Sequence, residues 1–159
     1  MAVSNHPREV TDALWDPSDL AGDGETGDGV IAHALLTGSD SALLLPMRPA
    51  QVRAGALLRW SDAMGRKEIV RRLAGWAALR SPLGRLLLRN RIGIRSHEPD
   101  SLHTYLAEAL DTDRIVIAGT WGPPRPNRKP VLRLYNAQSE TIGFAKVGWN
   151  PLTRSLVDC

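Results

Sequence analysis

The stretch RIVIAGTWGPPRPNRKPVLRLYNAQSETIGFAKVG, residues 114–148, decides the fold because it holds three strand candidates in a row. Residues 114–119 are rich in β-branched side chains, residues 130–136 alternate in part between apolar and polar, and residues 141–148 close the set. The proline-rich segment between the first two candidates is a loop, and AQSE makes a tight link between the last two. We therefore predict three antiparallel strands in the C-terminal third of the chain.

Helices are predicted on both sides of these strands. In SLHTYLAEALD the apolar residues recur at i, i+3, i+4, i+7 and i+8, and Asp100 or Ser101 is placed to cap the start. The predicted apolar face of that helix consists of Leu102, Tyr105, Leu106, Ala109 and Leu110. After the strands, Asn150 and Pro151 offer an N-cap and a proline at the first helical position, so another helix is expected there. The whole is an α+β fold, a small antiparallel sheet with flanking helices.

The segment before these elements is less regular. Residues 30–49 contain two short apolar runs around GSDS, a pattern typical of a β-hairpin but also of two short buried helices. Farther on, Ile69, Leu73, Trp76 and Ala77 follow helical spacing, and Pro82 should end that helix. We expect residues 30–159 to form a single α+β domain.

Residues 1–29 are strongly acidic. They hold seven carboxylates against Arg8 alone, together with several glycines and few large apolar groups, which predicts a flexible lead-in. The chain has no apolar run of about 18 residues, and its N-terminus has no signal-peptide pattern, so no transmembrane segment is predicted and a cytoplasmic location is expected.

Residues 48–95 are strongly basic, with twelve arginines and lysines against Asp62 and Glu68. One role for this segment is binding to nucleic acid, because arginines neutralise phosphates and Trp60 and Trp76 offer rings on which bases stack. Another is contact with an anionic membrane surface. A solvated helix face in an arginine-rich chain is the third interpretation, and the segment itself does not decide among them.

The familiar catalytic and metal-binding motifs are missing. GDGETG, residues 22–27, matches the glycine spacing of a dinucleotide loop, but no strand precedes it, and Asp23 and Glu25 would repel a pyrophosphate. The sequence has no Walker A, EF-hand, HExxH or GxSxG pattern, and the single cysteine, Cys159, excludes a CxxC zinc site. The histidines show no metal-ligand spacing and are expected to be surface or satisfied core residues; they are His6, His33, His97 and His103.

Lys146 stands out within the last predicted strand. Side chains alternate along a strand, so Lys146 shares a face with Ile142 and Phe144, while Gly143 and Ala145 point the other way. Burying an unpaired ammonium is costly, so the lysine should either meet an anionic partner or reach water from the edge of the sheet.

The order of strand, loop, strand, tight turn, strand with an inward lysine and helix resembles the amino-terminal lobe of kinase-fold phosphotransferases. Residues 101–159 are similar to that lobe in aminoglycoside-phosphotransferase-like small-molecule kinases, through RKPVLRLYN, TIGFAKVGWN and PLTRSLVDC. The resemblance implies binding of ATP with Mg²⁺, with Lys146 at the phosphates. It also implies that the loop from Gly119 to Lys129 covers the nucleotide, so Gly119, Thr120 and Gly122 are the other expected nucleotide-binding residues.

The resemblance stops before the catalytic loop of that fold. No H-x-D or D-F-G-like sequence is present, and Asp158 is the only acid after Lys146. We therefore expect a truncated, nucleotide-binding portion without catalytic activity of its own, completed by a missing C-terminal lobe or a partner chain. Two alternatives stay open: a basic module that binds nucleic acid or anionic surfaces through residues 48–95, and a structural protein whose strands are completed by another chain.

Overall fold

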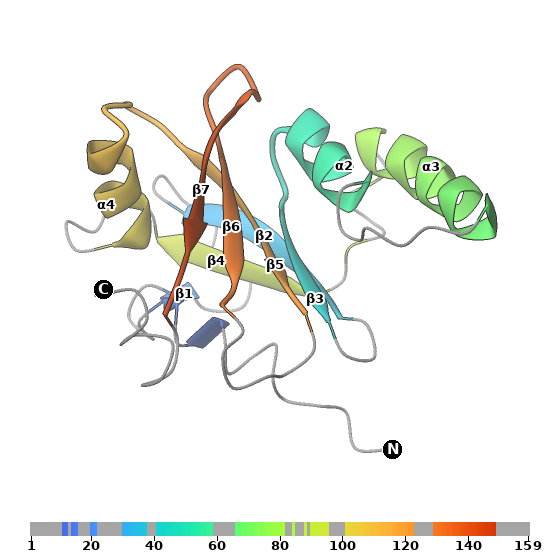
Figure 1. Cartoon of the computed structure of the whole chain (residues 1–159), viewed down its shortest axis with the longest axis horizontal. Coiled ribbons are helices and arrows are strands. Elements are labelled where there is room, and N and C mark those ends of the chain that lie inside the picture. The colour runs from blue at the N-terminus through green and yellow to red at the C-terminus, as the bar shows by residue number, and fades with distance from the viewer. Residues whose placement is uncertain are drawn as a thin grey trace.

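A computed structural model describes residues 11–12, 14–15, 20–21, 30–37, 41–58, 66–81, 84, 88, 90–95, 101–122 and 129–148, with the side chains of 21 and 66–72 excepted. Within this part of the chain, seven strands form one antiparallel sheet in the spatial order β1-β4-β2-β3-β5-β6-β7 (Figure 1). The strands are β1 Leu20–Ala21, β2 Val30–Thr37, β3 Ala42–Pro46, β4 Arg91–Arg95, β5 Val116–Trp121, β6 Val131–Tyr135 and β7 Thr141–Lys146. The predicted α+β class with an antiparallel sheet is confirmed.

The three strands predicted in the C-terminal third are β5, β6 and β7, and they pair in chain order. The AQSE link is a tight turn in which Ser139 adopts a positive φ of 68° and the Asn136 amide donates to the Glu140 carbonyl at 3.0 Å. The Asn136 side chain accepts a hydrogen bond from the Glu140 amide, which closes the turn further. On its other side β5 pairs with β3, so these strands form one half of a larger sheet.

The hairpin interpretation of residues 30–49 is the correct one of the two. β2 and β3 pair in antiparallel register, with Leu36 opposite Leu43 and Thr37 opposite Ala42. All five residues of β3 are buried because the strand lies between β2 and β5 and is covered on both faces. An unbroken apolar run such as ALLLP is typical of a strand in that position.

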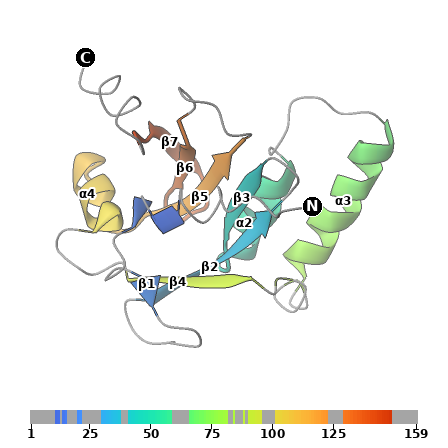
Figure 2. The same cartoon turned by 90° about the horizontal axis from the view of Figure 1, so that it is seen from below.

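Three described helices pack on the two faces of the sheet: α2 Ala50–Leu58, α3 Arg66–Arg80 and α4 Leu102–Ala109. Helices α2 and α3 lie together at one side of the molecule and α4 at the other (Figures 1 and 2). As expected, α3 ends before Pro82, and the Ser101 side chain caps α4 by accepting from the Thr104 amide. The buried residues of α4 are His103 and Leu106, whereas Tyr105 is exposed, so the predicted apolar face is wrong by part of a turn.

The hydrophobic core consists of two clusters, one on each face of the sheet. One cluster includes Leu35, Leu44, Ile117 and Leu132 with Leu106 of α4. The other is formed by alternate residues of the same strands and by α2 and the end of α3; it includes Leu43, Leu45, Val116, Tyr135, Val52 and Leu79.

The described residues of the acidic N-terminal segment pack on the sheet. Leu14 and Trp15 belong to the same cluster as Leu106, and only 1% of Trp15 is exposed. β1 pairs with β4, with Leu20 opposite Ile94. These few residues are attached to the sheet because Trp15 supplies a large apolar side chain, a feature that the acidic composition of the segment obscures.

Arg53 of α2, one of the arginines of the basic segment, is buried and links the end of β3 to the end of α3. Its guanidinium donates to the carbonyl oxygens of Met47, at the end of β3, and of Leu79, near the end of α3, with the Nε–O distance to Leu79 being 2.9 Å. A longer bond reaches the Ser81 carbonyl. This arginine therefore satisfies carbonyl groups that the ends of the helix and strand leave without partners.

In the described part of the chain no helix has the length and apolarity needed to cross a membrane. The helix expected from Asn150, the GDGETG segment, and His6 and His97 all lie outside the described residues.

Candidate functional site

One face of β5, β6 and β7 is covered only in part. The residues that point to this face are Val116, Ala118 and Thr120 from β5, Val131, Arg133 and Tyr135 from β6, and Ile142, Phe144 and Lys146 from β7. Near β5 the face is covered by α2, and Val116 and Ala118 are buried. On β7 it is open, because Phe144 is 59% exposed and Lys146 is exposed as well. Exposure thus increases toward the last strand.

Two of the predicted nucleotide-binding residues lie in one row across this face. Thr120 is opposite Val131, and Val131 is opposite Lys146, so the threonine and the lysine flank the same valine on its two sides. Two steps between neighbouring strands separate their backbones by roughly 10 Å. Gly122 directly follows β5, at the end of the sheet where Lys146 lies. Residues 123–128 of the expected nucleotide loop lie outside the described residues.

Lys146 does not point inward, and this corrects the interpretation of its strand. The buried face of β7 is the other one, where Ala145 and Val147 pack against the cluster that contains Leu132. Lys146 and its face-mates Ile142 and Phe144 are exposed. The lysine therefore reaches water, and its charge is available to a ligand on the surface.

Gly119 serves packing and does not face the row of Thr120 and Lys146. It points to the opposite face of β5, opposite Leu132, and a Cβ atom built on it would lie 2.2 Å from the Trp121 ring. The indole of Trp121, two residues along the same strand, lies over Gly119 and occupies the space that a side chain at position 119 would fill. This predicted site residue is thus separated from the other two by the sheet itself.

Replacing Gly119 with alanine is expected to lower the free energy of unfolding by about 2 kcal/mol, because the added methyl group must displace a buried indole. Urea-induced unfolding followed by circular dichroism measures the change. Gly143→Ala is the matched control, since its Cβ would meet nothing closer than 3.9 Å in a strand of the same sheet. A loss at Gly119 no larger than that at Gly143 would contradict the packing role.

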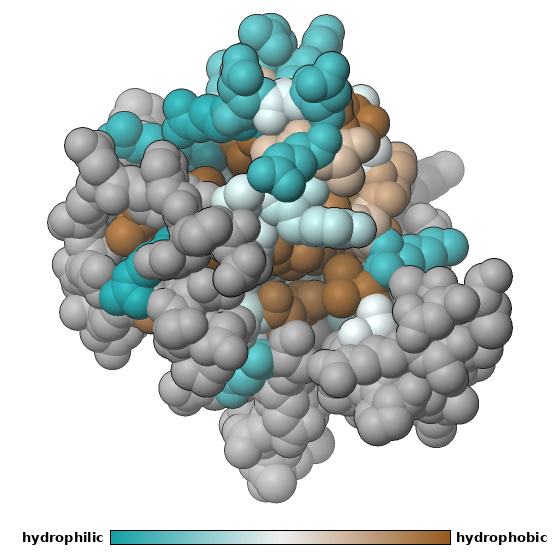
Figure 3. All heavy atoms as spheres, turned by 90° about the vertical axis from the view of Figure 1, so that its left-hand side faces the viewer, coloured by the Kyte–Doolittle hydropathy of each residue, from teal (hydrophilic) through white to brown (hydrophobic). Residues whose placement is uncertain are grey.

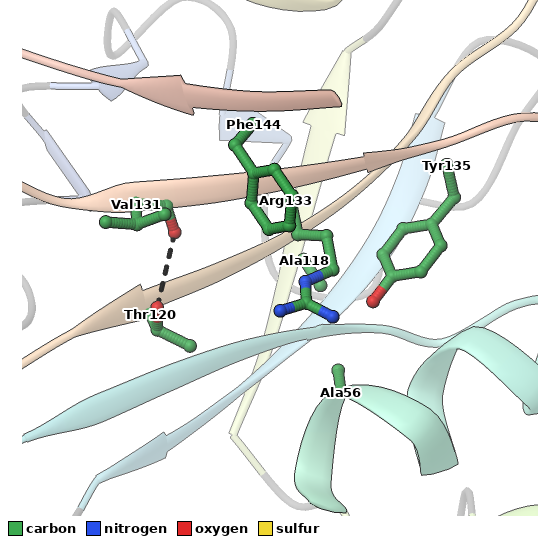
Figure 4. A pocket seen from close by; sticks show the side chains of 7 residues that line it. All are labelled: Ala56, Ala118, Thr120, Val131, Arg133, Tyr135 and Phe144. Atoms are coloured by element: carbon green, nitrogen blue, oxygen red, sulfur yellow. Dashed lines mark hydrogen bonds between the residues drawn. The ribbon is translucent and has the colours of Figure 1, made fainter. Parts of the chain in front are cut away.

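A shallow hollow lies on the same face, between α2 and the strands (Figure 4). It is lined by Ala56, Ala118, Thr120, Val131, Arg133, Tyr135 and Phe144. The Arg133 guanidinium lies over the Phe144 ring at 4.8 Å from its centroid, and the Thr120 hydroxyl donates to the Val131 carbonyl at 3.4 Å. Sequence reasoning missed Arg133 and Tyr135; the available signal was the alternation of VLRLY, which puts both on one face of β6.

The described basic side chains of residues 48–95 do not line this hollow. Five basic side chains of that segment are described: Arg48, Arg53, Arg80, Arg91 and Arg95. Of these, Arg53 is buried, and Arg80 lies over the ring of Trp76 at 5.3 Å. Trp76 itself packs in part against the core, so this ring has a structural role.

A second group of titratable side chains lies inside the core. His33 of β2 and His103 of α4 are buried, with ring centroids 6.1 Å apart. The ring nitrogens of His33 lie 3.2 Å from the carbonyl oxygen of Ile31 and 3.1 Å from that of Ile117, and the neutral ring donates its single N–H to one of the two. Both ring nitrogens of His103 lack a partner in the described structure. Burial lowers the pKa of His33 to about 4, and burial together with the nearby His33 lowers the pKa of His103 to about 3. Both rings are therefore neutral at pH 7.

Within the described residues no three His, Cys, Asp or Glu side chains come close enough together to hold a metal ion.

Hydrophobic residues reach the surface on the side of the molecule that carries α4, where they lie between hydrophilic ones (Figure 3). Tyr105 of α4 and Leu110, which follows the helix, are both exposed.

Comparison of the chain with protein-family models, curated proteins and solved structures gave no match.

Proposed function

We propose that this chain is the nucleotide-binding portion of an ATP-dependent small-molecule phosphotransferase. The supporting observation is the row of Thr120, Val131 and Lys146 on the open face of β5, β6 and β7. Lys146 places an exposed ammonium at one end of the row. At the other end, two residues before Gly122, Thr120 places a hydroxyl that would exchange its bond to the Val131 carbonyl for one to a phosphate oxygen. A triphosphate distributes its negative charge over three phosphate groups. An ammonium and a hydroxyl two strands apart could therefore each bind a different phosphate group of the same ligand.

Catalysis is a separate matter from binding. Phosphoryl transfer depends on acids that hold Mg²⁺ and orient the acceptor, and the chain has no H-x-D or D-F-G-like sequence that would supply them. Mg²⁺ would arrive with the triphosphate. The proposal for this chain is accordingly binding without turnover, and the chemistry requires a further lobe or a partner chain.

The open edge of the sheet at β7 is consistent with the need for a further lobe or a partner chain. It also favours the alternative of a partner-dependent protein. β7 is the last strand in the sheet order, and Ile142 and Phe144 on it are exposed. Among the described residues nothing pairs with its outer edge, and an unpaired edge is a template for another strand. Both interpretations place the contact with the completing partner at β7.

Thermal unfolding with and without ATP and Mg²⁺ tests the proposal. At ten times its Kd a ligand stabilises the folded chain by about 1.4 kcal/mol, which for a chain of this size raises Tm by about 3–6 °C. Lys146→Ala is expected to remove most of this increase while leaving the Tm of the ligand-free chain unchanged, because the side chain is exposed.

Arg114→Ala is the matched control. It also removes one exposed positive charge, but from the opposite end of β5, and the increase with ATP should persist. Absence of any increase for the unmodified chain at millimolar ATP would contradict nucleotide binding. An equal increase in the Lys146→Ala chain would contradict the role of the lysine.

A further inference from the structure

The hollow between α2 and β6 contains two polar groups without an evident structural purpose. Its walls are mostly apolar, formed by Ala56 of α2, Ala118 of β5, Val131 of β6 and the ring of Phe144. The two groups are the guanidinium of Arg133 and the hydroxyl of Tyr135, which come from alternate residues of β6 and therefore from the same face of the strand. Figure 4 shows both extending from β6 toward the side occupied by Ala56.

Tyr135 is the more informative of the two. Only 2% of the residue is exposed, and its hydroxyl oxygen is buried without a hydrogen-bond partner in the described structure. A buried hydroxyl that makes no hydrogen bond costs about 1–3 kcal/mol, a loss that phenylalanine at this position would avoid. The hydroxyl is thus positioned for a partner that enters the hollow.

Arg133 supplies positive charge next to that hydroxyl. Its guanidinium is held over the Phe144 ring, an arrangement that uses the flat face of the group and leaves its N–H edges for hydrogen bonds. Among the described residues, those that line the hollow include no acid. A planar guanidinium with free N–H edges binds carboxylate or phosphate oxygens in pairs, and the hydroxyl of a tyrosine donates a third hydrogen bond.

We propose that this hollow is a binding site for an oxyanion, the carboxylate or phosphate group of a small ligand, with Arg133 and Tyr135 as the binding residues. The walls of the hollow are mostly apolar, so their chemistry matches a ligand whose oxyanion group carries a small apolar substituent. The two binding residues lie next to the row of Thr120, Val131 and Lys146, and Thr120 and Val131 form part of the wall of the hollow. Lys146 does not line the hollow, so anion binding there does not require the lysine.

Nuclear magnetic resonance of the full chain, labelled with ¹⁵N-arginine, tests the proposal. The Nε–H signal of Arg133, assigned from its absence in Arg133→Met, is followed while inorganic phosphate, phenyl phosphate or benzoate is added at constant ionic strength. We expect a saturable change with at least one of these probes. A response to benzoate alone identifies a carboxylate ligand, a response to the phosphates alone identifies a phosphate ligand, and a response to both identifies a general oxyanion site.

The variants decide whether the named residues form the site. Tyr135→Phe keeps the shape of the side chain and should keep the fold, and it is expected to weaken binding about five- to tenfold. Arg133→Met retains the apolar stem and should weaken binding more than tenfold. Because this variant lacks the Arg133 signal, its binding is followed in uniformly ¹⁵N-labelled protein through the backbone amide of Phe144. Arg114→Met, the control, should leave the affinity unchanged.

Three results would overturn the proposal. One is a change in the Arg133 signal that is linear in probe concentration or equal to that caused by chloride. Another is full affinity in Tyr135→Phe, and the third concerns Lys146. Lys146→Ala separates this site from the nucleotide row: it should change the affinity by less than twofold, and a larger loss would place the anion at Lys146 and overturn the assignment to the hollow.

Discussion

Lowering the pH from 7.5 to 5 is expected to reduce the free energy of unfolding by roughly 4 kcal/mol, through His33 and His103 alone. In the unfolded chain each imidazole takes up a proton near its ordinary pKa of 6.5, whereas in the folded chain the pKa values are about 4 and about 3. Between pH 6.5 and about 4 the unfolded state therefore binds more protons than the folded state. The stability is fully present above pH 6.5 and is lost as the pH falls through this range.

Urea unfolding at half-unit pH intervals from 7.5 to 5 measures this dependence. His103→Leu provides the matched comparison, because it removes one of the two buried rings and also the two ring nitrogens that have no partner. We expect its loss of stability over the same range to be about half as large, and its stability at pH 7.5 to equal or exceed that of the unmodified chain. Carboxylates contribute equally to both proteins and cancel in the difference. Identical pH dependence in the two proteins would contradict a neutral, buried His103.

Trp15→Ala is expected to lower the free energy of unfolding by about 3–5 kcal/mol. The side chain is almost completely buried in the cluster with Leu106, so its removal leaves a large cavity and exposes apolar surface of the sheet. A change of this size is a large fraction of the total stability of a small domain, which is about 5–15 kcal/mol.

The same measurement distinguishes packing from charge in this segment. Asp12 is exposed within three residues of Trp15, and Asp12→Ala should change the free energy of unfolding by less than about 0.5 kcal/mol. Trp15→Phe should lie between the two, because it keeps an aromatic ring but fills less volume. A loss below about 1 kcal/mol in Trp15→Ala would show that residues 11–15 are dispensable to the core.

The sequence predicted the C-terminal strands well because their local signals agree. RIVIAG is rich in β-branched residues, AQSE is short and polar, and proline excludes the intervening loop from the sheet. β4 was missed because RIGIR carries an arginine at each end and a glycine in the middle, so its strand character comes from pairing with β1 and β2. In α4 the apolar periodicity assigned Tyr105 to the buried face and left out His103, whereas His103 is buried and Tyr105 is exposed. Burial of a histidine depends on the residues of the sheet that pack against it, here including His33 of β2.

The candidate site was predictable only in part. Alternation placed Lys146, Phe144 and Ile142 on one face of the strand, but it does not say which face is buried. That is decided by packing: the core cluster that includes Leu106 of α4 covers the face of Ala145, and in the described structure the other face of β7 is open. The unpaired hydroxyl of Tyr135 is likewise a property of the assembled structure and has no signature in VLRLY.

The pairing of β1 with β4 has a consequence for biosynthesis. Leu20 leaves the ribosome 74 residues before its partner Ile94, so β1 cannot join the sheet until most of the chain has been made. Closing so long a loop is slow compared with forming the local β6–β7 hairpin. During this interval Leu14 and Trp15 lack the core that covers them, while the net negative charge of residues 1–29 repels other copies of the same nascent segment.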